Sequence, residues 1–116
     1  MDPQPDSLAA DTPLLVYITA PNRDTAVNLG RMLIARRLAA CVNVVPKMVS
    51  IYRWQDEVQT ENESLLLVKT LRGRWAELEQ AVKAAHPYEV PCITAVSLDR
   101  AHEPFAAWIR GEATGG

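Results

Sequence analysis

Three residues in this sequence have side chains that bind soft metal ions. Cys41 lies in the fragment LAACVN, His86 begins the fragment HPYEVP, and Cys92 follows His86 by six residues. A cysteine thiolate prefers ions such as Cu(I) and Zn(II), and imidazole binds copper and zinc well. The sequence has no CxxC or HxxxH spacing, so a metal site would have to be assembled from separate elements or separate chains.

Each of these residues also has a purely structural interpretation. Cys41 has the character of a small buried apolar residue, which is common for a free cysteine. His86, at the end of a predicted helix, can hydrogen-bond the last helix carbonyls. Cys92 can be a core thiol at the start of a strand, or it can meet His86 across the turn between them. The residue types alone leave both interpretations open.

Glu61 and Glu63 form a pair of carboxylates on one predicted strand. Side chains on a strand alternate between its faces, so these two point to the same side. Together they can share a cation or perform acid–base work. Alternatively they belong to a solvated face, where like charges repel each other. Lys69 is on the same face further along the strand and is too far away to reach both carboxylates.

The hydrophobic pattern predicts the elements that would position these residues. Short apolar runs predict strands, and apolar residues at steps of three and four predict helices. Their order is β-α-β-β-α-β with a further terminal helix. That order is typical of an α+β protein of the ferredoxin-like split βαβ type, with one antiparallel sheet and two helices on one of its faces. The expected strands are residues 14–20, 41–54, 57–70 and 92–98, and the expected helices are residues 21–40, 73–86 and 104–111.

A few residues indicate how the helices begin and pack. Asn22 or Asp24 can cap the start of the first helix. Gly30 lowers the helix propensity there, and close packing of the helix on the sheet explains its presence. The residues expected to face the core from the helices are Ala26, Leu29, Gly30, Leu33, Leu38, Trp75, Leu78, Val82, Ala85, Phe105, Trp108 and Ile109.

The fragment SIYRWQDEV is predicted to form the tip of a long β-hairpin. Each of its strands is about twice the usual length of 5–6 residues, and Pro46 indicates a bulge or an edge in the first strand. Two helices cannot cover the outer half of such a hairpin. Its apolar side chains would therefore be exposed in a monomer, and they are Met48, Val49, Ile51, Tyr52 and Trp54.

Exposed apolar patches and unpaired strand edges are typical of protein interfaces. We therefore expect the hairpin to contact another copy of the chain, with Ile51, Tyr52 and Trp54 as interface residues. One alternative is a long hairpin that simply faces solvent. Another is that Tyr52 and Trp54 form a platform on which a ligand stacks.

The length of 116 residues predicts one domain. We assign residues 14–110 to this domain and residues 1–13 and 111–116 to flexible tails. Twelve basic and fourteen acidic residues give a net charge of −2, which argues against a nucleic-acid or membrane partner. No apolar run approaches the ~20 residues of a membrane span, and the acidic, Pro-rich start is not a secretory signal. We expect a cytoplasmic protein with reduced thiols.

Several fragments, in order and at similar spacing, resemble the CutA divalent-cation tolerance proteins. They are TAPN, RRLAACVNVVP, SIYRWQDEV, LLLVKT and HPYEVP, and the resemblance extends over residues 14–110. It implies a ferredoxin-like homotrimer whose subunits pair their sheets through long hairpins, a plan shared with the PII signalling proteins. It also implies a link to tolerance of divalent metals, notably copper, with Cys41 at the position of a proposed copper ligand.

A trimer would bring further residues into a shared site. Glu61 and Glu63 would then line an inter-subunit cleft together with Tyr88 and Glu89, and with Lys69 further along the same face. Two departures from the family pattern affect this prediction. Many members have Glu directly after YEVP, where this chain has the softer ligand Cys92. Many have Gly near the hairpin tip, where this chain has Gln55-Asp56, which indicates a turn without strongly positive φ or one that tolerates it at Asp56.

The resulting prediction is a non-enzymatic homotrimer that binds copper or another divalent ion and supports metal tolerance. No partner protein beyond further copies of the chain is identified from the residues. The alternative is a PII-like signalling module that binds a small anion or nucleotide in the cleft, although no Gly-rich phosphate cradle is present. An acylphosphatase would need such a loop after the first strand, where TAPNRDTA has no Gly. An RNA-binding sheet would need aromatic residues on its central strands, which offer only Tyr17.

Overall fold

The structure, a computed structural model, describes residues 9–114. Its four strands form one sheet in the order β2-β3-β1-β4, and all neighbouring strands are antiparallel. This confirms the predicted α+β, split βαβ arrangement. The elements are β1 (Pro13–Ala20), α1 (Arg23–Ala35), β2 (Cys41–Trp54), β3 (Glu57–Leu71), the short 3₁₀ helix η2 (Arg72–Arg74), α2 (Trp75–Ala85), β4 (Ile93–Ser97) and α3 (Glu103–Glu112).

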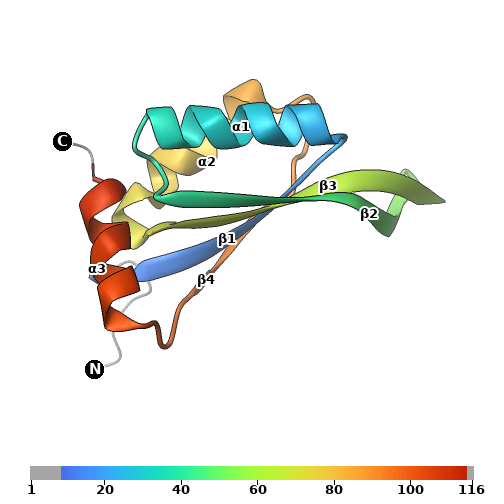
Figure 1. The fold of residues 1–116 in the computed structure, drawn as a ribbon. Helices are drawn as coiled ribbons and strands as arrows, with labels where there is room; N and C mark the ends of the chain where they lie inside the picture. The colour runs from blue at the N-terminus through green and yellow to red at the C-terminus, as the bar shows by residue number, and fades with distance from the viewer. Residues whose placement is uncertain (1–8, 115–116) are drawn as a thin grey trace.

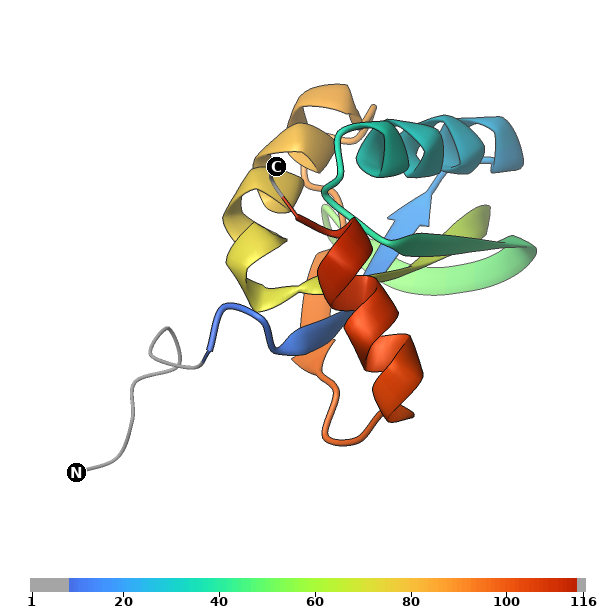
Figure 2. The ribbon, with the colours of Figure 1, turned by 60° about the vertical axis from the view of Figure 1, so that its left-hand side comes forward.

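The elements lie in two layers with a projecting hairpin. Helices α1 and α2 cover one face of the sheet, and α3 lies at the end of the sheet opposite to the tip of the β2–β3 hairpin (Figure 1). Turning the molecule brings α3 forward and shows α1 and α2 side by side above the strands (Figure 2). No helix in the described part of the chain is long and apolar enough to cross a bilayer.

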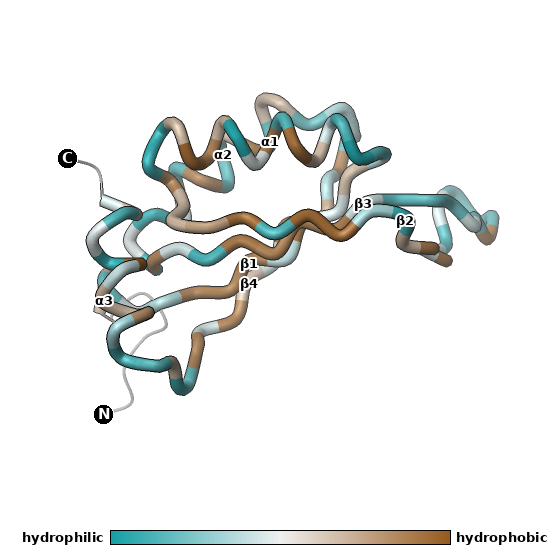
Figure 3. Tube along the Cα trace, in the orientation of Figure 1, coloured by the Kyte–Doolittle hydropathy of each residue, from teal (hydrophilic) through white to brown (hydrophobic). Residues whose placement is uncertain are grey.

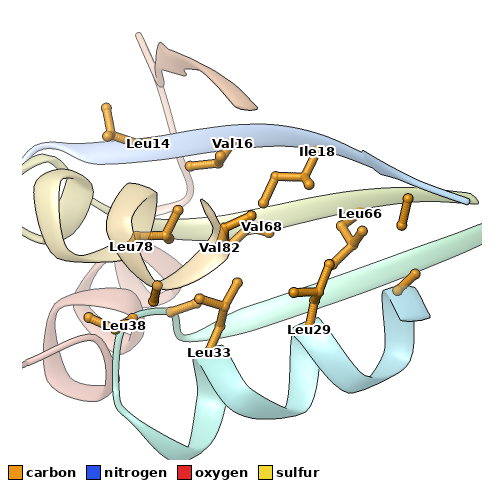
Figure 4. Close-up of a cluster of buried hydrophobic side chains, with 14 residues drawn as sticks. Leu14, Val16, Ile18, Leu29, Leu33, Leu38, Leu66, Val68, Leu78 and Val82 are labelled. Atoms are coloured by element: carbon orange, nitrogen blue, oxygen red, sulfur yellow. The ribbon is translucent and has the colours of Figure 1, made fainter. Parts of the chain in front are cut away.

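The hydrophobic core fills the space between the sheet and helices α1 and α2. Alternate residues of the central strands, such as Val16 and Ile18 of β1 and Leu66 of β3, are fully buried there. Leu29 and Leu33 of α1 and Leu78 and Val82 of α2 point toward them (Figure 4). The other residues of each strand face away from the helices, and this side of the sheet is called the open face below.

Helix α1 begins and packs as the sequence predicted. Of the two possible capping residues, Asn22 performs the role, because its Oδ1 accepts a hydrogen bond from the Thr25 N–H at 2.8 Å. A methyl group added at Gly30 would lie 3.1 Å from Cγ1 of Val42, so the glycine permits the predicted close contact of helix and sheet. The predicted end at Ala40 is wrong, because the helix ends at Ala35. Leu38 is buried as expected, but it lies in the connection to β2.

Some residues predicted to be buried on the last two helices are exposed. Helix α2 ends at Ala85, just before His86-Pro87 as predicted, although Ala85 itself is exposed. In α3 only Ile109 of the three predicted inward residues is buried. Phe105 and Trp108 are 37% and 44% exposed, and their rings stack on each other with centroids 5.7 Å apart. The reason is that α3 packs on the end of the sheet through Ile109, next to Leu71 of β3, so only this face of the helix is buried.

Residues on both sides of the predicted domain contact it. The N–H of Gly73 donates to the carbonyl of Ala10 at 2.8 Å, and the N–H of Arg72 donates to that of Thr12 at 2.9 Å. Residues 9–13 are therefore attached to the domain. Ala113, after α3, is fully buried. The remaining parts of the predicted tails, residues 1–8 and 115–116, lie outside the described residues.

The β2–β3 hairpin continues well beyond the four-stranded sheet. Strand β1 ends where Ala20 pairs with Ser64, whereas β2 and β3 stay paired as far as Trp54 and Glu57. Residues 48–63, called the arm below, thus form a two-stranded ribbon that α1 and α2 do not cover (Figure 1). Apolar residues follow the strands beneath the helices, and hydrophilic residues mark the outer part of β3 (Figure 3).

Two residues of the arm, and Lys47 just before it, have left-handed backbone. A register shift between Val45 and Met48 confirms the predicted bulge at Pro46, and Lys47 has φ of 63° there. At the tip, Gln55 and Asp56 have φ of 50° and 65°. Positive φ at both central residues is typical of a two-residue type I′ hairpin turn. Of the two predicted alternatives, a turn without strongly positive φ is wrong and positive φ at Asp56 is confirmed, with Gln55 also positive.

Neighbouring residues of α1 allow a matched test of the core. We expect Leu33→Ala to lower the free energy of unfolding by about 2–5 kcal/mol, because Leu33 is fully buried and its removal leaves a cavity. Ile34→Ala removes a similar volume from a side chain that is 42% exposed, and should cost less than about 1 kcal/mol. Chemical denaturation at one fixed protein concentration measures both. Equal losses would contradict the assigned burial.

Candidate functional site

Most of the residues that the sequence singled out lie on the open face or on the arm. Leu66, Val68 and Thr70 of β3 are buried under the helices, so the odd-numbered residues of this strand face the other way. Glu61 and Glu63 consequently share one face, as predicted from strand alternation. Tyr17, from the middle of β1, pairs with Leu67 and also belongs to this face.

A groove lies where the arm meets the open face and the loop between α2 and β4. Its volume is about 750 Å³. Four aromatic rings from β1, β2 and the loop form much of its lining, together with an acid and a thiol. These six residues are Tyr17, Tyr52, Trp54, Glu63, Tyr88 and Cys92.

A chain of hydrogen bonds fixes the α2–β4 loop, residues 86–92, against the groove. The hydroxyl of Tyr88 donates to Oε2 of Glu63 at 2.9 Å, and Glu63 is only 7% exposed. The backbone N–H of Tyr88 donates to Nδ1 of His86 at 3.1 Å. Because Nδ1 accepts, the ring proton is on Nε2, which donates to the carbonyl of Thr19 at 2.7 Å. The two rings of the loop also contact each other, with centroids 4.8 Å apart.

The groove disfavours negative charge on Tyr52, Tyr88 and Cys92. Burial, together with the hydrogen bond to Glu63 and its charge, raises the pKa of Tyr88 well above 10. Burial also raises the pKa of the Cys92 thiol, with a further contribution from Glu63, while a hydrogen bond with Thr19 partly offsets this. The pKa of Tyr52 is raised by loss of hydration and by Glu61 and Glu63. The raised pKa favours the neutral thiol of Cys92 over the thiolate unless a cation stabilises the negative charge.

The three residues predicted as metal ligands have different surroundings. Cys41 is half-buried at the start of β2 opposite Lys69, and its Sγ lies 3.8 Å from Oδ1 of Asn43. Cys92 is exposed and lines the groove. Both ring nitrogens of His86 are engaged in hydrogen bonds, so neither is available to a metal ion in this conformation. Within residues 9–114, no three His, Cys, Asp or Glu side chains gather into a metal-binding group.

The residues predicted for a cleft fall into two groups. Glu63, Tyr88 and Glu89 line the groove. Glu61 lies near enough to contribute to the raised pKa of Tyr52. Lys69 is at the far end of the open face, where its Nζ donates to Oδ1 of Asn43.

The residues predicted for an interface are all exposed. Ile51, Tyr52 and Trp54 are 70%, 42% and 43% exposed. All three also line the groove. The sequence predicted them as interface residues and assigned a different set of residues to a cleft. It also missed Tyr17 as a groove residue. The signal was available, since Tyr17 alternates with apolar residues that face the core.

An α+β sheet with two covering helices and an overhanging hairpin places the chain in the ferredoxin-like class. Residues 14–112 match the family described as "CutA1 divalent ion tolerance protein". The chain belongs to this family, which confirms the resemblance that the sequence fragments indicated.

Similar proteins come from bacteria and plants. The "Divalent-cation tolerance protein CutA" of Thermus thermophilus is 46% identical over 96 residues, which cover 83% of this chain and 93% of that protein. The solved structure of the Thermus thermophilus protein has a TM-score of 0.84 at 43% identity, covering 86% of this chain and 97% of its own. CutA1 from Oryza sativa has a TM-score of 0.87 at 34% identity, covering 91% and 99%.

The bond between Tyr88 and Glu63 predicts a measurable effect on stability. Tyr88→Phe should lower the free energy of unfolding by about 1–3 kcal/mol at neutral pH, because a buried carboxylate loses its donor. Tyr17→Phe is the control, since the Tyr17 hydroxyl donates only to Sδ of Met48 at 3.8 Å. Chemical denaturation of both variants and the parent measures the difference, and equal losses would count against the bond.

The raised pKa of Tyr88 gives this bond a pH dependence. The folded state favours the neutral phenol, so its contribution to stability is fully present below pH 10, the ordinary pKa. It is lost as the pH rises above that value, and the parent protein should therefore lose stability more steeply than Tyr88→Phe does above pH 10. Parallel slopes for the two proteins would contradict the assignment.

Proposed function

We propose that this chain acts in divalent ion tolerance as a non-enzymatic homotrimer that holds copper, or another divalent or soft metal ion, between its subunits. The observation that carries the proposal is the arm, which presents Ile51, Tyr52 and Trp54 to solvent in a single chain. Aromatic side chains of this size bury about 150–250 Å² each at an interface. An apolar surface of that kind on a soluble protein typically contacts a partner.

The geometry of the arm favours contact with further copies of the chain. Both edges of the ribbon are unpaired beyond Ser64, so it can add to the sheet edge of a neighbour. A contact between two different surfaces of the same molecule closes into a ring when the rotation fits. The number of three subunits is supported by the family membership rather than by the geometry of one chain.

The metal would be shared because one chain offers too few ligands. Cys41 and Cys92 are both free thiols, and soft ions prefer thiolate ligands. They lie in different places on the chain, so neighbouring subunits must supply the rest of a complete coordination shell. His86 is not among the proposed ligands, because both of its ring nitrogens are hydrogen-bonded. One bonds the backbone of Tyr88 and the other bonds the carbonyl of Thr19 in β1. Free thiols also support a reducing, cytoplasmic location.

The second candidate is a PII-like signalling module, and the groove favours it because its volume suits a small ligand. The charge of the groove argues against the anion or nucleotide expected for such a module. Glu63 and Glu89 line it, and none of its lining residues is Lys, Arg or His. A phosphate there would meet carboxylates without a compensating cation.

Oligomeric state tests the first part of the proposal. In sedimentation velocity at micromolar concentration, the parent should have three times the chain mass of 12.8 kDa. Trp54→Glu should shift it toward the single-chain mass, because a charge on the arm cannot be buried in the contact. Trp108→Glu, a similarly exposed Trp on α3, is the control and should keep the assembly. A parent that sediments as a single chain would overturn the trimer.

Copper titration tests the second part. Under anaerobic conditions with a competing chelator, Cu(I) should bind the assembled protein, and the Cys41→Ser/Cys92→Ser double variant should bind it about tenfold more weakly or worse. His86→Asn should lower stability and leave the Cu(I) affinity unchanged. Unaltered affinity in the double variant would exclude the thiols as ligands and with them this form of metal handling.

A further inference from the structure

We propose that the pocket between the C-terminal ends of α1 and α3 binds a free α-amino acid with an aliphatic side chain. Its volume of about 380 Å³ lies at the small end of the usual range for small-molecule sites. Four larger side chains and three alanines line it, and the larger ones are Ile34, Arg37, Trp108 and Glu112. None of the lining residues is a proposed metal ligand or belongs to the arm, so the site is separate from both.

The pocket lies away from the surface that an arm would cover. Helix α3 is at the end of the sheet opposite to the hairpin tip, and its last turn lies beside the connection from α1 to β2 (Figure 2). An added arm needs a sheet edge, and the two edge strands are β2 and β4. Pro46 and the register shift interrupt the edge of β2, whereas β4 has no Pro and its residues 94–97 are exposed. The arm of a neighbour therefore fits β4, and the pocket beside the start of β2 is left open.

The apolar part of the pocket suits a small aliphatic side chain. The three small lining residues are Ala35, Ala39 and Ala40, whose methyl groups leave room between the two helix ends. Beside them Ile34 and Trp108 are large apolar side chains that the single chain leaves exposed. An aliphatic ligand would remove this apolar surface from water, which is favourable.

The polar part of the pocket offers one charge of each sign. Nη1 of Arg37 donates to the backbone carbonyl and to Oε2 of Glu112, at 3.4 and 3.5 Å. These bonds are long and both side chains are half-exposed, so the pair holds only weakly. The other guanidinium N–H groups have no hydrogen-bond partner among residues 9–114. A ligand carboxylate can bind them while a ligand ammonium donates to Glu112, so a zwitterion matches both charges and a singly charged ligand matches only one.

The backbone conformation of Arg37 supports this role. Helix α1 ends in a Schellman motif, in which the N–H of Leu38 donates to the carbonyl of Leu33 at 2.9 Å. The N–H of Arg37 donates to the carbonyl of Ile34 at 3.1 Å, and the φ of Arg37 is 55°. Glycine is the usual residue at this position, because a side chain makes left-handed backbone costly. Such strain is typical of functional positions, and here it accompanies a guanidinium that lines the pocket.

Three probes with the same isobutyl group and different charges test the proposal. They are L-leucine, 3-methylbutylammonium, which lacks the carboxylate, and 4-methylpentanoate, which lacks the ammonium group. Each is titrated into the full ¹⁵N-labelled chain, and the indole N–H resonance of Trp108 reports on the pocket. Those of Trp54 and Trp75 serve as internal controls because neither residue lines it. We expect saturable shifts at Trp108 with leucine and at least about tenfold weaker binding of the other two probes.

Arg37→Gly separates ligand binding from a structural role. Glycine adopts left-handed backbone without strain, so the variant should retain the denaturation midpoint of the parent while leucine binding weakens about tenfold or more. Glu112→Gln should also weaken leucine binding, because it removes the partner of the ammonium group. Arg31→Gln removes an exposed charge from α1 outside the pocket and should change nothing. Equal binding of the three probes, unchanged leucine binding by Arg37→Gly, or no saturable shift at Trp108 would each overturn the proposal.

Sedimentation of the same samples separates this site from self-association. The parent with and without saturating leucine, and Arg37→Gly, should all have the same mass, because the pocket lies outside the proposed contact. A lower mass for Trp108→Glu would place the pocket in that contact and overturn the ligand site. A lack of saturable leucine binding in an intact assembly would overturn the ligand site and leave the trimer standing.

Discussion

The structure depends on a mismatch in strand length. Strand β1 stops at Ala20, opposite Ser64, while β2 and β3 continue to a turn at Gln55-Asp56. Helices α1 and α2 cover only the four-stranded part, so the outer ribbon has no core of its own (Figure 1). An isolated two-stranded ribbon is marginal in water. Both the exposed apolar residues of the arm and the groove beneath them follow from this overhang.

A second constraint is the buried carboxylate of Glu63 at the base of the arm. Burial of a carboxylate requires hydrogen bonds, and Tyr88 provides one. Tyr88 is positioned by His86, which also reaches Thr19 at the end of β1. The acid, the loop and the sheet edge therefore form one connected unit. Its residues combine negative charge with aromatic rings, and this charge disfavours a phosphate in the groove.

Much of the fold was predictable because it depends on local patterns. Apolar runs predicted the strands β1 and β3, helical spacing identified most of the core residues of α1 and α2, and the bulge or edge predicted at Pro46 is a bulge. The errors came where packing decides. Phe105 and Trp108 were expected inside because they are large and apolar, but the end of the sheet accepts only one face of α3.

The sequence by itself determined the order of elements, the family, the long hairpin and the chemical types available for a site. Periodicity and fragment spacing are properties of the chain, so no tertiary contact is needed to recognise them. Only the tertiary structure decided which side chains meet. It engaged both nitrogens of His86, separated Cys41 from Cys92, and brought Tyr17 and Tyr88 to the arm. Such juxtapositions depend on strand register and loop path, where residues far apart in sequence come together through packing that no local pattern records.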